Sequence, residues 1–98
     1  MDIKFRDVNY GIVEARAVMQ IADGVFLNEI TILRKDGEIE VELPVKSFKA
    51  KDGKIHSIDI ITFEDDNKRT LFILDIKTAY MEWRKKLRKI RVYEPEQI

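Results

Sequence analysis

The amino-acid sequence predicts an α+β fold, in which an antiparallel β-meander of about five strands is followed by a C-terminal amphipathic helix. Two patterns carry this prediction. Asp-Gly pairs recur along the chain, and Asp-Gly is a strong hairpin signal because it accepts the positive φ angles of tight turns. The segments between the pairs alternate apolar and polar residues, whereas the last third repeats its apolar residues at helical spacing. Since 98 residues suit one hydrophobic core, we expect a single domain over residues 1–98.

The first two strands are expected on either side of a turn at Asn9-Tyr10-Gly11. The earlier strand covers residues 3–8. In the later strand one face is polar, with Glu14, Arg16 and Gln20. Its other face is apolar and consists of Val13, Ala15, Ala17 and Met19.

Asp-Gly pairs precede both the third and the fourth strand. The third strand, residues 25–33, is rich in apolar residues and alternates less cleanly, as expected for a strand covered on both faces. An apolar strand of this kind at an open edge would invite pairing with a second copy of the chain. In residues 38–43 Glu38, Glu40 and Glu42 alternate with apolar residues, so we expect a solvent-exposed acidic face; its functional interpretation is a shield against nucleic acid.

A fifth strand is expected over residues 55–63, after Asp52-Gly53, and the helix is expected from about 76 to 90. Residues 69–76 fit either a strand or the start of the helix, and periodicity does not decide between the two. The helix is the only available cover for the apolar face of the sheet. Its apolar stripe consists of Phe72, Ile76, Ala79, Tyr80, Trp83, Leu87 and Ile90, and its candidate N-caps are Asp65, Asp66 and Asn67.

Composition places the chain among globular proteins, with 45% apolar residues, 37% charged residues and a net charge of zero. There is no cysteine, which excludes a disulfide scaffold, a thiolate zinc site and a cysteine nucleophile and fits a reducing cytoplasm. The charged N-terminus and the lack of a long apolar run predict a soluble cytoplasmic protein without a signal peptide or a membrane partner.

The zero net charge conceals segregation, because residues 1–43 carry a balance of −4 and residues 44–98 a balance of +4. One basic cluster, around a predicted hairpin tip, consists of Lys46, Lys49, Lys51 and Lys54. A two-stranded ribbon of this kind can follow a phosphate backbone, although lysines also protect sheet edges from aggregation. Phe48 lies among these lysines, where it would either stack on an unpaired base or, as we prefer, pack on the body of the protein.

A second basic cluster occupies the end of the predicted helix, residues 84–91, and contains no acid. It would bind phosphates by releasing counterions, or it would simply be a solvated helix end that favours the macrodipole. The cluster exceeds what a helix end requires, because Arg84 and Arg88, like Lys85 and Lys89, are like charges one turn apart.

No catalytic, cofactor or metal site is predicted. His56 is the only histidine and has no ligand set around it, and Asp59 nearby lacks a nucleophile or a paired acid. The glycines are all at turns, so no glycine-rich loop is left to hold a phosphate group. We therefore do not expect an enzyme.

Several short motifs occur in a fixed order over residues 15–84: Ala15-Arg16-Ala17, Phe26-Leu27-Asn28-Glu29-Ile30, Leu43-Pro44-Val45-Lys46, Asp52-Gly53, Ile58-Asp59-Ile60 and Glu82-Trp83-Arg84. Their order and spacing resemble the stage V sporulation protein G family, also called septation protein SpoVG. The resemblance implies a β-meander followed by a helix. It also implies a homodimer that binds DNA, or alternatively RNA, and acts as a regulator of septation or sporulation. Carried over to this sequence, it singles out Lys46 first, then Lys54 and Arg84.

Together with the two basic clusters, this resemblance predicts a nucleic-acid-binding homodimer that uses both clusters. The predicted contact residues are Lys46, Lys49, Lys51, Lys54, Arg84, Lys85, Arg88 and Lys89. The alternative is a protein-interaction or assembly module whose basic patch binds an acidic partner.

Overall fold

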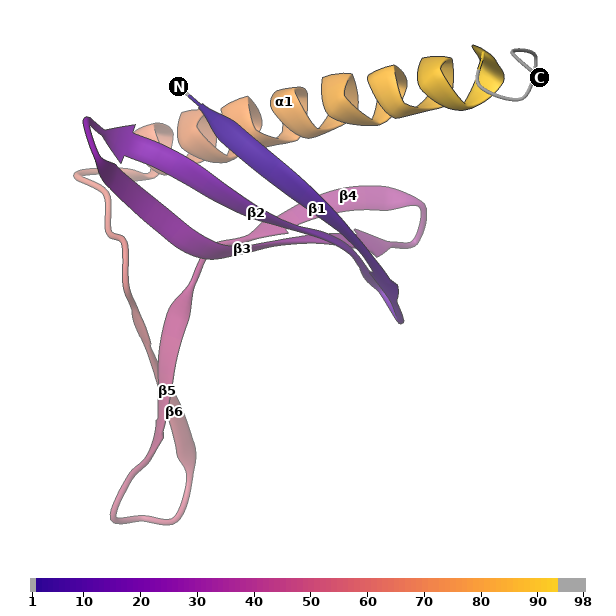
Figure 1. The fold of residues 1–98 in the computed structure, drawn as a ribbon. Helices are drawn as coiled ribbons and strands as arrows, with labels where there is room; N and C mark the ends of the chain where they lie inside the picture. The colour runs from indigo at the N-terminus through magenta and orange to yellow at the C-terminus, as the bar shows by residue number, and fades with distance from the viewer. Residues whose placement is uncertain (1, 94–98) are drawn as a thin grey trace.

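The computed structural model describes the backbone of residues 2–93 and the side chains of residues 2–87, as one α+β domain (Figure 1). Six antiparallel strands precede a long helix. Their bounds are β1 (Ile3–Tyr10), β2 (Val13–Ala22), β3 (Val25–Lys35), β4 (Glu38–Glu42), β5 (Val45–Lys49), β6 (Ile55–Asp59) and α1 (Asp66–Tyr93). The predicted fold class is confirmed.

The strands form two separate sheets, one of four strands in the order β1-β2-β3-β4 and one of only β5 and β6. The sequence indicated about five strands, and the additional one is Val45–Lys49. Pro44 explains the separation, because proline has no N–H to donate and therefore interrupts the hydrogen-bond ladder after β4. Beyond Pro44 the chain leaves the four-stranded sheet and forms a hairpin of its own, which we call the arm (residues 45–59).

The turns follow the chemistry that the Asp-Gly pairs predict. Between β3 and β4, Asp36 and Gly37 have φ angles of 51° and 80°. Positive values at both central residues are the requirement of the tight turn that matches the twist of a β-hairpin. Replacement of Gly37 by a residue with a Cβ would therefore strain this turn, even though open space surrounds the position.

β3 lies in the interior of the sheet, paired with β2 on one side and β4 on the other. The condition for pairing with a second copy through this apolar strand, an open edge, is therefore not met. The expectation that it is covered on both faces is confirmed in its centre, where Ile30, Thr31, Ile32 and Leu33 are all buried. Its apolar character comes from this central position in the sheet.

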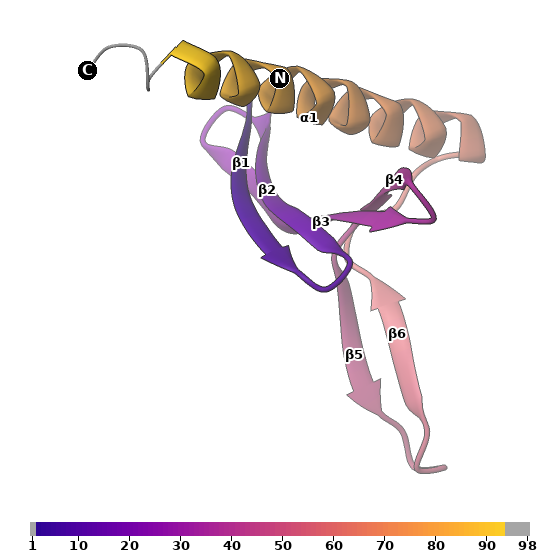
Figure 2. The same ribbon diagram turned by 90° about the vertical axis from the view of Figure 1, so that its right-hand side faces the viewer.

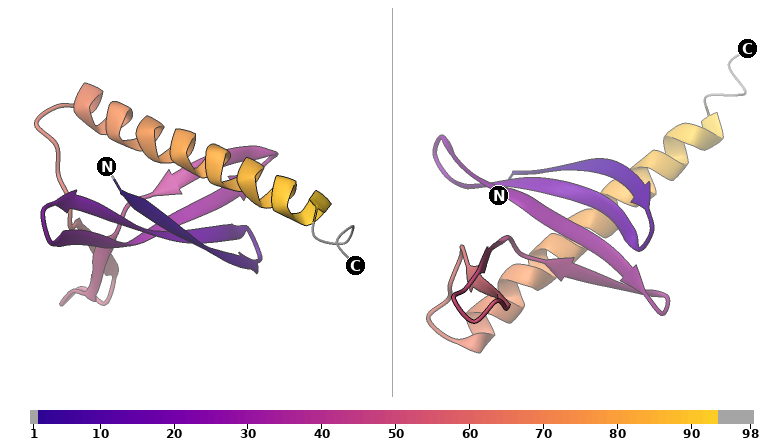
Figure 3. Two further views of the ribbon diagram at one scale, coloured as in Figure 1. Left: turned by 45° about the horizontal axis from the view of Figure 1, so that its top comes forward. Right: turned by 90° about the horizontal axis from the view of Figure 1, so that it is seen from below.

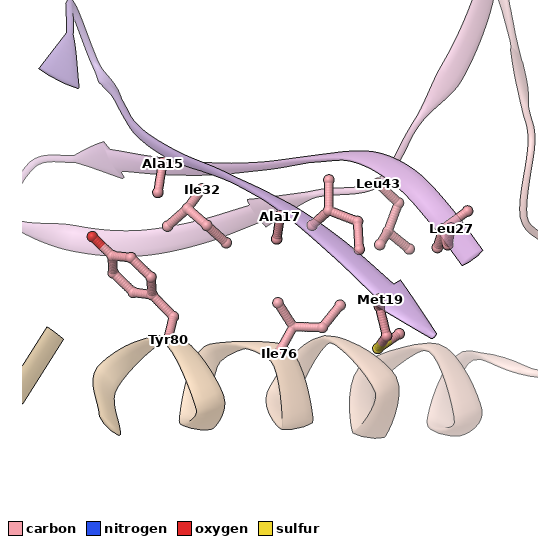
Figure 4. Close-up of a cluster of buried hydrophobic side chains, with 9 residues drawn as sticks. Ala15, Ala17, Met19, Leu27, Ile32, Leu43, Ile76 and Tyr80 are labelled. Carbon is pink, nitrogen blue, oxygen red and sulfur yellow. The ribbon is translucent and has the colours of Figure 1, made fainter. Parts of the chain in front are cut away.

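The core lies between the sheet and α1, which crosses one face of the sheet diagonally (Figure 3). Ala15 and Ala17 of β2 are small, and Ile76 and Tyr80 of α1 fill the space above them with fully buried side chains (Figure 4). Large residues on β2 at these positions would push the helix away from the sheet. The alternation predicted for β2 and the helical stripe predicted around Ile76 thus meet in one core.

α1 begins at Asp66, so residues 69–76 are helical and the strand alternative is wrong. The Asp65 side chain accepts a hydrogen bond of 2.9 Å from the Lys68 backbone N–H, which makes Asp65 the N-cap among the three candidates. Asp66 adds a negative charge to the first turn, where it favours the helix macrodipole. The cap, rather than the apolar stripe, therefore determines where the helix starts.

Candidate nucleic-acid interface

The arm projects from the four-stranded sheet on the side opposite α1 (Figures 1 and 2). β5 and β6 pair with each other and contact no other helix or strand within residues 2–93. Every residue of both strands is exposed. The molecule therefore extends to 61 Å in its longest dimension although its core is small.

The register of the arm places its lysines on both faces. Lys46 pairs with Ile58 and Phe48 with His56, and these four side chains share one face. Lys49 pairs with Ile55 on the other face, where Ser47 and Ser57 lie 3.4 Å apart. A duplex or a single strand that lay along either face would meet one of the strand lysines.

Phe48 does not pack on the body of the protein, which corrects the preferred sequence interpretation. Its ring stacks on His56 at a centroid distance of 5.7 Å, and 41% of the residue remains exposed. The isolation of the arm explains the difference, because β5 contacts no described strand or helix other than β6. An exposed aromatic pair beside Lys46 is the arrangement that stacks on unpaired bases.

The tip of the arm spans residues 50–54 and presents Lys51 and Lys54. Asp52 shapes it by accepting a hydrogen bond of 2.9 Å from the Lys54 backbone N–H, while Gly53 adopts a φ angle of 81°. The Asp52 carboxylate also lies 3.4 Å from the His56 imidazole. Asp52 thus holds the tip, and none of the four arm lysines makes an ion pair within the described residues.

Arg84, the first residue of the helical cluster, is engaged in the fold. Its guanidinium donates a hydrogen bond of 3.0 Å to Asp7 of β1 and one of 2.7 Å to the Tyr80 hydroxyl. It also lies 4.9 Å from the centre of the Trp83 ring, and only 21% of its side chain is exposed. The hydrogen bond to Asp7, more than its other contacts, raises the pKa of Arg84 above its ordinary value. Arg84 is therefore poorly available to a phosphate group.

The structure describes the side chains of only some of the remaining residues of the helical cluster. Lys85 and Lys86 are exposed on α1. Arg88 and Lys89 belong to the helix, but their side chains lie outside the described part of the chain. Lys85 and Lys86 are thus the exposed cations of the helical cluster whose side chains are described.

Within the described residues, the arm lysines do not form one surface with Lys85 and Lys86 of α1. α1 lies on one side of the sheet and the arm on the other, and the end of α1 points away from the arm (Figures 1 and 2). Basic residues that the sequence grouped by charge are therefore separated by the body of the protein. A single continuous interface through both clusters would require a long ligand or a second protomer.

Three cations that sequence reasoning missed lie on the sheet face opposite α1, which we call the open face. They are Lys4, Arg6 and Arg16, all exposed. Their positions could have been noticed, since Lys4 and Arg6 flank the inward-facing Phe5 in β1. The charge balance of −4 over residues 1–43 concealed them.

Glu38, Glu40 and Glu42 of β4 are exposed, as predicted. On the open face Glu40 lies 3.7 Å from Lys35 of the neighbouring β3. The open face therefore has a basic part on β1 and β2 and an acidic part on β4.

Glu14 and Tyr80 connect the sheet to the helix on the inner side. The Tyr80 hydroxyl and the Arg34 guanidinium both donate hydrogen bonds to the Glu14 carboxylate. The Arg34 contact is the largest influence and holds the pKa of Glu14 below its ordinary value, against the opposing effect of burial. Burial is the main cause that raises the pKa of Tyr80. This network links β2 and β3 to α1 and is therefore structural.

Among the residues that the structure describes, no cluster of three or more histidine, cysteine, aspartate or glutamate side chains could hold a metal ion. Within the same residues no helix has the length and apolar character needed to cross a membrane. Comparison of the chain with protein-family models, curated proteins and solved structures gives no match.

Proposed function

We propose that this chain is a cytoplasmic nucleic-acid-binding regulator that contacts phosphates mainly through the lysines of the arm. One observation carries the proposal: an isolated hairpin bears Lys46, Lys49, Lys51 and Lys54, which make no ion pair with any described residue, next to an exposed aromatic pair. Lysines without carboxylate partners are free to replace the counterions of a nucleic-acid backbone. The resemblance to the SpoVG family supports DNA as the first ligand to test, RNA as the second, and a role in septation or sporulation as the process.

Fluorescence anisotropy with a labelled random duplex and a labelled single strand, over a range of salt concentrations, tests this proposal. In the arm variant Lys46, Lys49, Lys51 and Lys54 are changed to Gln. If all four contact duplex phosphates, the slope of log K against log salt becomes shallower by about 3 to 4. A control variant with the same loss of net charge has Lys35, Lys68, Arg69 and Lys77 changed to Gln. Absence of binding by the wild-type protein at low salt would overturn the proposal.

A variant with Lys85 and Lys86 changed to Gln decides whether the end of α1 takes part. We expect a smaller effect than that of the arm variant, because the two clusters lie on opposite sides of the sheet. An effect equal to that of the arm on the same short duplex would mean that two protomers bind it together.

We also propose a homodimer, joined through the face of the arm that carries Val45 and Ile55, opposite the face with Lys46 and Phe48. Both Val45 and Ile55 are exposed. Pairing of two β1 strands or of two β4 strands would instead bring together strands that carry like charges on the open face. Sedimentation should then show twice the chain mass of 11.6 kDa, and the changes Val45→Ser and Ile55→Ser should return the monomer.

The same exposed apolar residues favour a second candidate, a protein-interaction module with an acidic partner. Both candidates predict binding that weakens with salt, so the salt slope alone does not separate them. Binding of the purified protein to purified nucleic acid, with no third component, separates them.

A further inference from the structure

The open face is a second surface with the chemistry of a ligand site. α1 covers the opposite face of the four-stranded sheet, and the arm contacts neither β1 nor β2. Lys4 and Arg6 of β1 and Arg16 of β2 project from this open face, because their neighbours Phe5 and Ala17 face the helix. Nothing in the described part of the chain covers these three cations.

The position of these cations lowers the stability of the free protein. Arg6 and Arg16 are direct partners in the β1–β2 register, so two like charges lie opposite each other. Like charges directly across a sheet destabilise it. Arg16 donates a hydrogen bond of 3.0 Å to the Thr31 hydroxyl, but neither arginine, nor Lys4, makes an ion pair with a described carboxylate. A bound anion would remove this repulsion.

The same residues line a hollow of about 590 Å³ together with Asn28 and Glu29 of β3. β3 has an irregular register with β2 here, between the pairs Ala17–Ile30 and Met19–Leu27. Glu29 adopts a φ angle of 59°, in the left-handed region that non-glycine residues rarely occupy. Bulges and strained residues of this kind cluster at binding sites, where they redirect side chains. Here they add an amide and a carboxylate to the rim of a basic hollow.

Phe26 supplies an aromatic surface beside the cations. It is 56% exposed and pairs with Gln20, on the same face as Val18. A smaller hollow of about 50 Å³ joins Phe26, Val18, Asp2 and Lys4, so Lys4 lines both hollows. A phosphate group near Lys4 would therefore place the attached base within reach of Phe26.

We propose that the open face binds single-stranded nucleic acid, with Phe26 stacking on a base and Lys4, Arg6 and Arg16 contacting phosphates. A single strand fits better than a duplex, because only an unpaired base exposes its face to an aromatic ring. Asn28 and Glu29 offer hydrogen-bond partners to the edge of a base or to a sugar hydroxyl. The acidic residues of β4 direct the single-stranded nucleic acid along β1 and β2. This inference rests on the proposed nucleic-acid function and adds a second site and a strand preference to it.

The test uses the full chain with labelled 12-nucleotide oligo(dT), oligo(rU) and a duplex of matched length (suggested probes). The charge variant has Lys4, Arg6 and Arg16 changed to Gln, and the stacking variant is Phe26→Ala. A control with the same loss of charge has Lys68, Arg69 and Lys77 changed to Gln. Circular dichroism and thermal unfolding confirm that all variants fold.

We expect Phe26→Ala to weaken single-strand binding by about tenfold, since stacking on one base is worth about 1–3 kcal/mol. The charge variant should make the single-strand salt slope shallower by about 2, from three contacts at about 0.7 each. Duplex binding should change little in Phe26→Ala. Comparison of dT with rU shows whether the sugar hydroxyl contributes.

Phe26→Trp keeps the aromatic surface and adds a fluorescent reporter on the open face, whereas the native Trp83 lies on α1. Its emission should be quenched by oligo(dT) beyond any change in the wild type, and its affinity should match the wild type. This variant keeps the inference testable if Phe26→Ala folds poorly.

Three results would overturn the inference. Single-strand affinity could be unchanged in both open-face variants while the arm variant loses binding, which leaves the proposed function intact. Phe26→Ala could weaken duplex and single-strand binding equally, which would mean that the face has no strand preference. If the wild type binds no nucleic acid at all, the proposed function fails together with the open-face site.

Discussion

The Arg84 guanidinium of α1 donates a hydrogen bond of 3.0 Å to the Asp7 carboxylate of β1, and this ion pair fastens the second half of the helix to an edge strand. The same guanidinium reaches the Tyr80 hydroxyl, which in turn donates to Glu14 of β2. α1 is thereby connected to β1 and β2, which are distant from it in the sequence. A cation within a basic run has become part of the structure rather than part of a phosphate-binding surface.

Arg84→Gln should therefore lower stability more than nucleic-acid affinity. It removes a charge-assisted hydrogen bond in a half-buried site, so we expect a loss of about 1–3 kcal/mol in the free energy of unfolding. Urea unfolding measures it, and a double-mutant cycle with Asp7→Asn isolates the coupling. The exposed Lys85→Gln is the control and should change stability by less than about 0.5 kcal/mol. Loss of nucleic-acid affinity in Arg84→Gln at unchanged stability would contradict this assignment.

Tyr80→Phe should also destabilise the protein, although its ring is retained. The hydroxyl accepts from Arg84 and donates to Glu14, so its removal takes one hydrogen-bond partner from each of these charged groups in a partly buried site. A cost of about 1–3 kcal/mol is expected in chemical denaturation. Tyr10→Phe is the matched control, because Tyr10 is 80% exposed and its hydroxyl makes no hydrogen bond with a described residue; equal effects of the two changes would argue against the network.

Acid should weaken the protein partly through Glu14. The pKa of Glu14 lies below its ordinary value in the folded protein, chiefly because Arg34 donates a hydrogen bond to its carboxylate. The unfolded chain therefore binds a proton at higher pH than the folded protein does. The stabilisation is present above the ordinary glutamate pKa and is lost as the pH falls through the folded value.

Unfolding free energies between about pH 7 and pH 3 measure this effect. The wild type should lose more stability on acidification than Glu14→Gln, and the difference between the two proteins should shrink towards low pH. Parallel curves would show that Glu14 does not contribute to the pH dependence. Glu64→Gln is a control on an exposed carboxylate whose contact with Lys68, at 3.9 Å, is long.

Much of the fold could be predicted because buried residues recur in the sequence at the spacing of a strand or a helix. Ala15, Ala17 and Met19 alternate along β2 and are buried, and Ile76 and Tyr80 are one turn apart in α1 and are buried against them. Asp36-Gly37 predicted its turn because few other residues accept its φ angles. These features depend on local chemistry alone.

The features that depended on tertiary placement could not be predicted. Periodicity left residues 69–76 undecided, and the apolar pattern of β3 did not say whether that strand lies at an edge or in the centre of the sheet, where it is found. The arm lysines were found because they cluster in sequence, whereas the open-face cations come from two strands and meet only in the β1–β2 register. Arg84 was instead assigned to the phosphate-binding residues because its sequence neighbours are basic, whereas its spatial neighbour Asp7 is acidic.

The core between β2 and α1 should respond strongly to Ile76→Ala and weakly to Leu74→Ala. Ile76 is fully buried over the sheet, so the change removes buried methyl groups and leaves a cavity, at an expected cost of about 2–5 kcal/mol. Leu74 lies half a turn away on the helix and is 53% exposed, so its truncation should cost less than about 1 kcal/mol. Thermal and chemical unfolding compare the two. Similar losses would mean that a partner covers the outer side of α1.

The arm should be removable without loss of the domain. The backbone N–H of Ile60 donates a hydrogen bond of 3.3 Å to the Pro44 carbonyl, so the two ends of the arm are adjacent and a short glycine linker can replace residues 45–59. No other described element contacts β5 or β6. The shortened chain should therefore keep its cooperative unfolding, with a free energy within about 1 kcal/mol of the wild type.

The nucleic-acid binding of the shortened chain should change instead. Duplex binding should fall to the level of the arm variant in which the four lysines are Gln, because both proteins lack the same phosphate contacts. Single-strand binding through the open face should persist, since Lys4, Arg6, Arg16 and Phe26 lie on strands that the deletion leaves in place. If the shortened chain unfolds, the arm is needed for folding and its isolation is incomplete; if duplex binding survives, the phosphate contacts lie elsewhere, with Lys85 and Lys86 of α1 as the next residues to change.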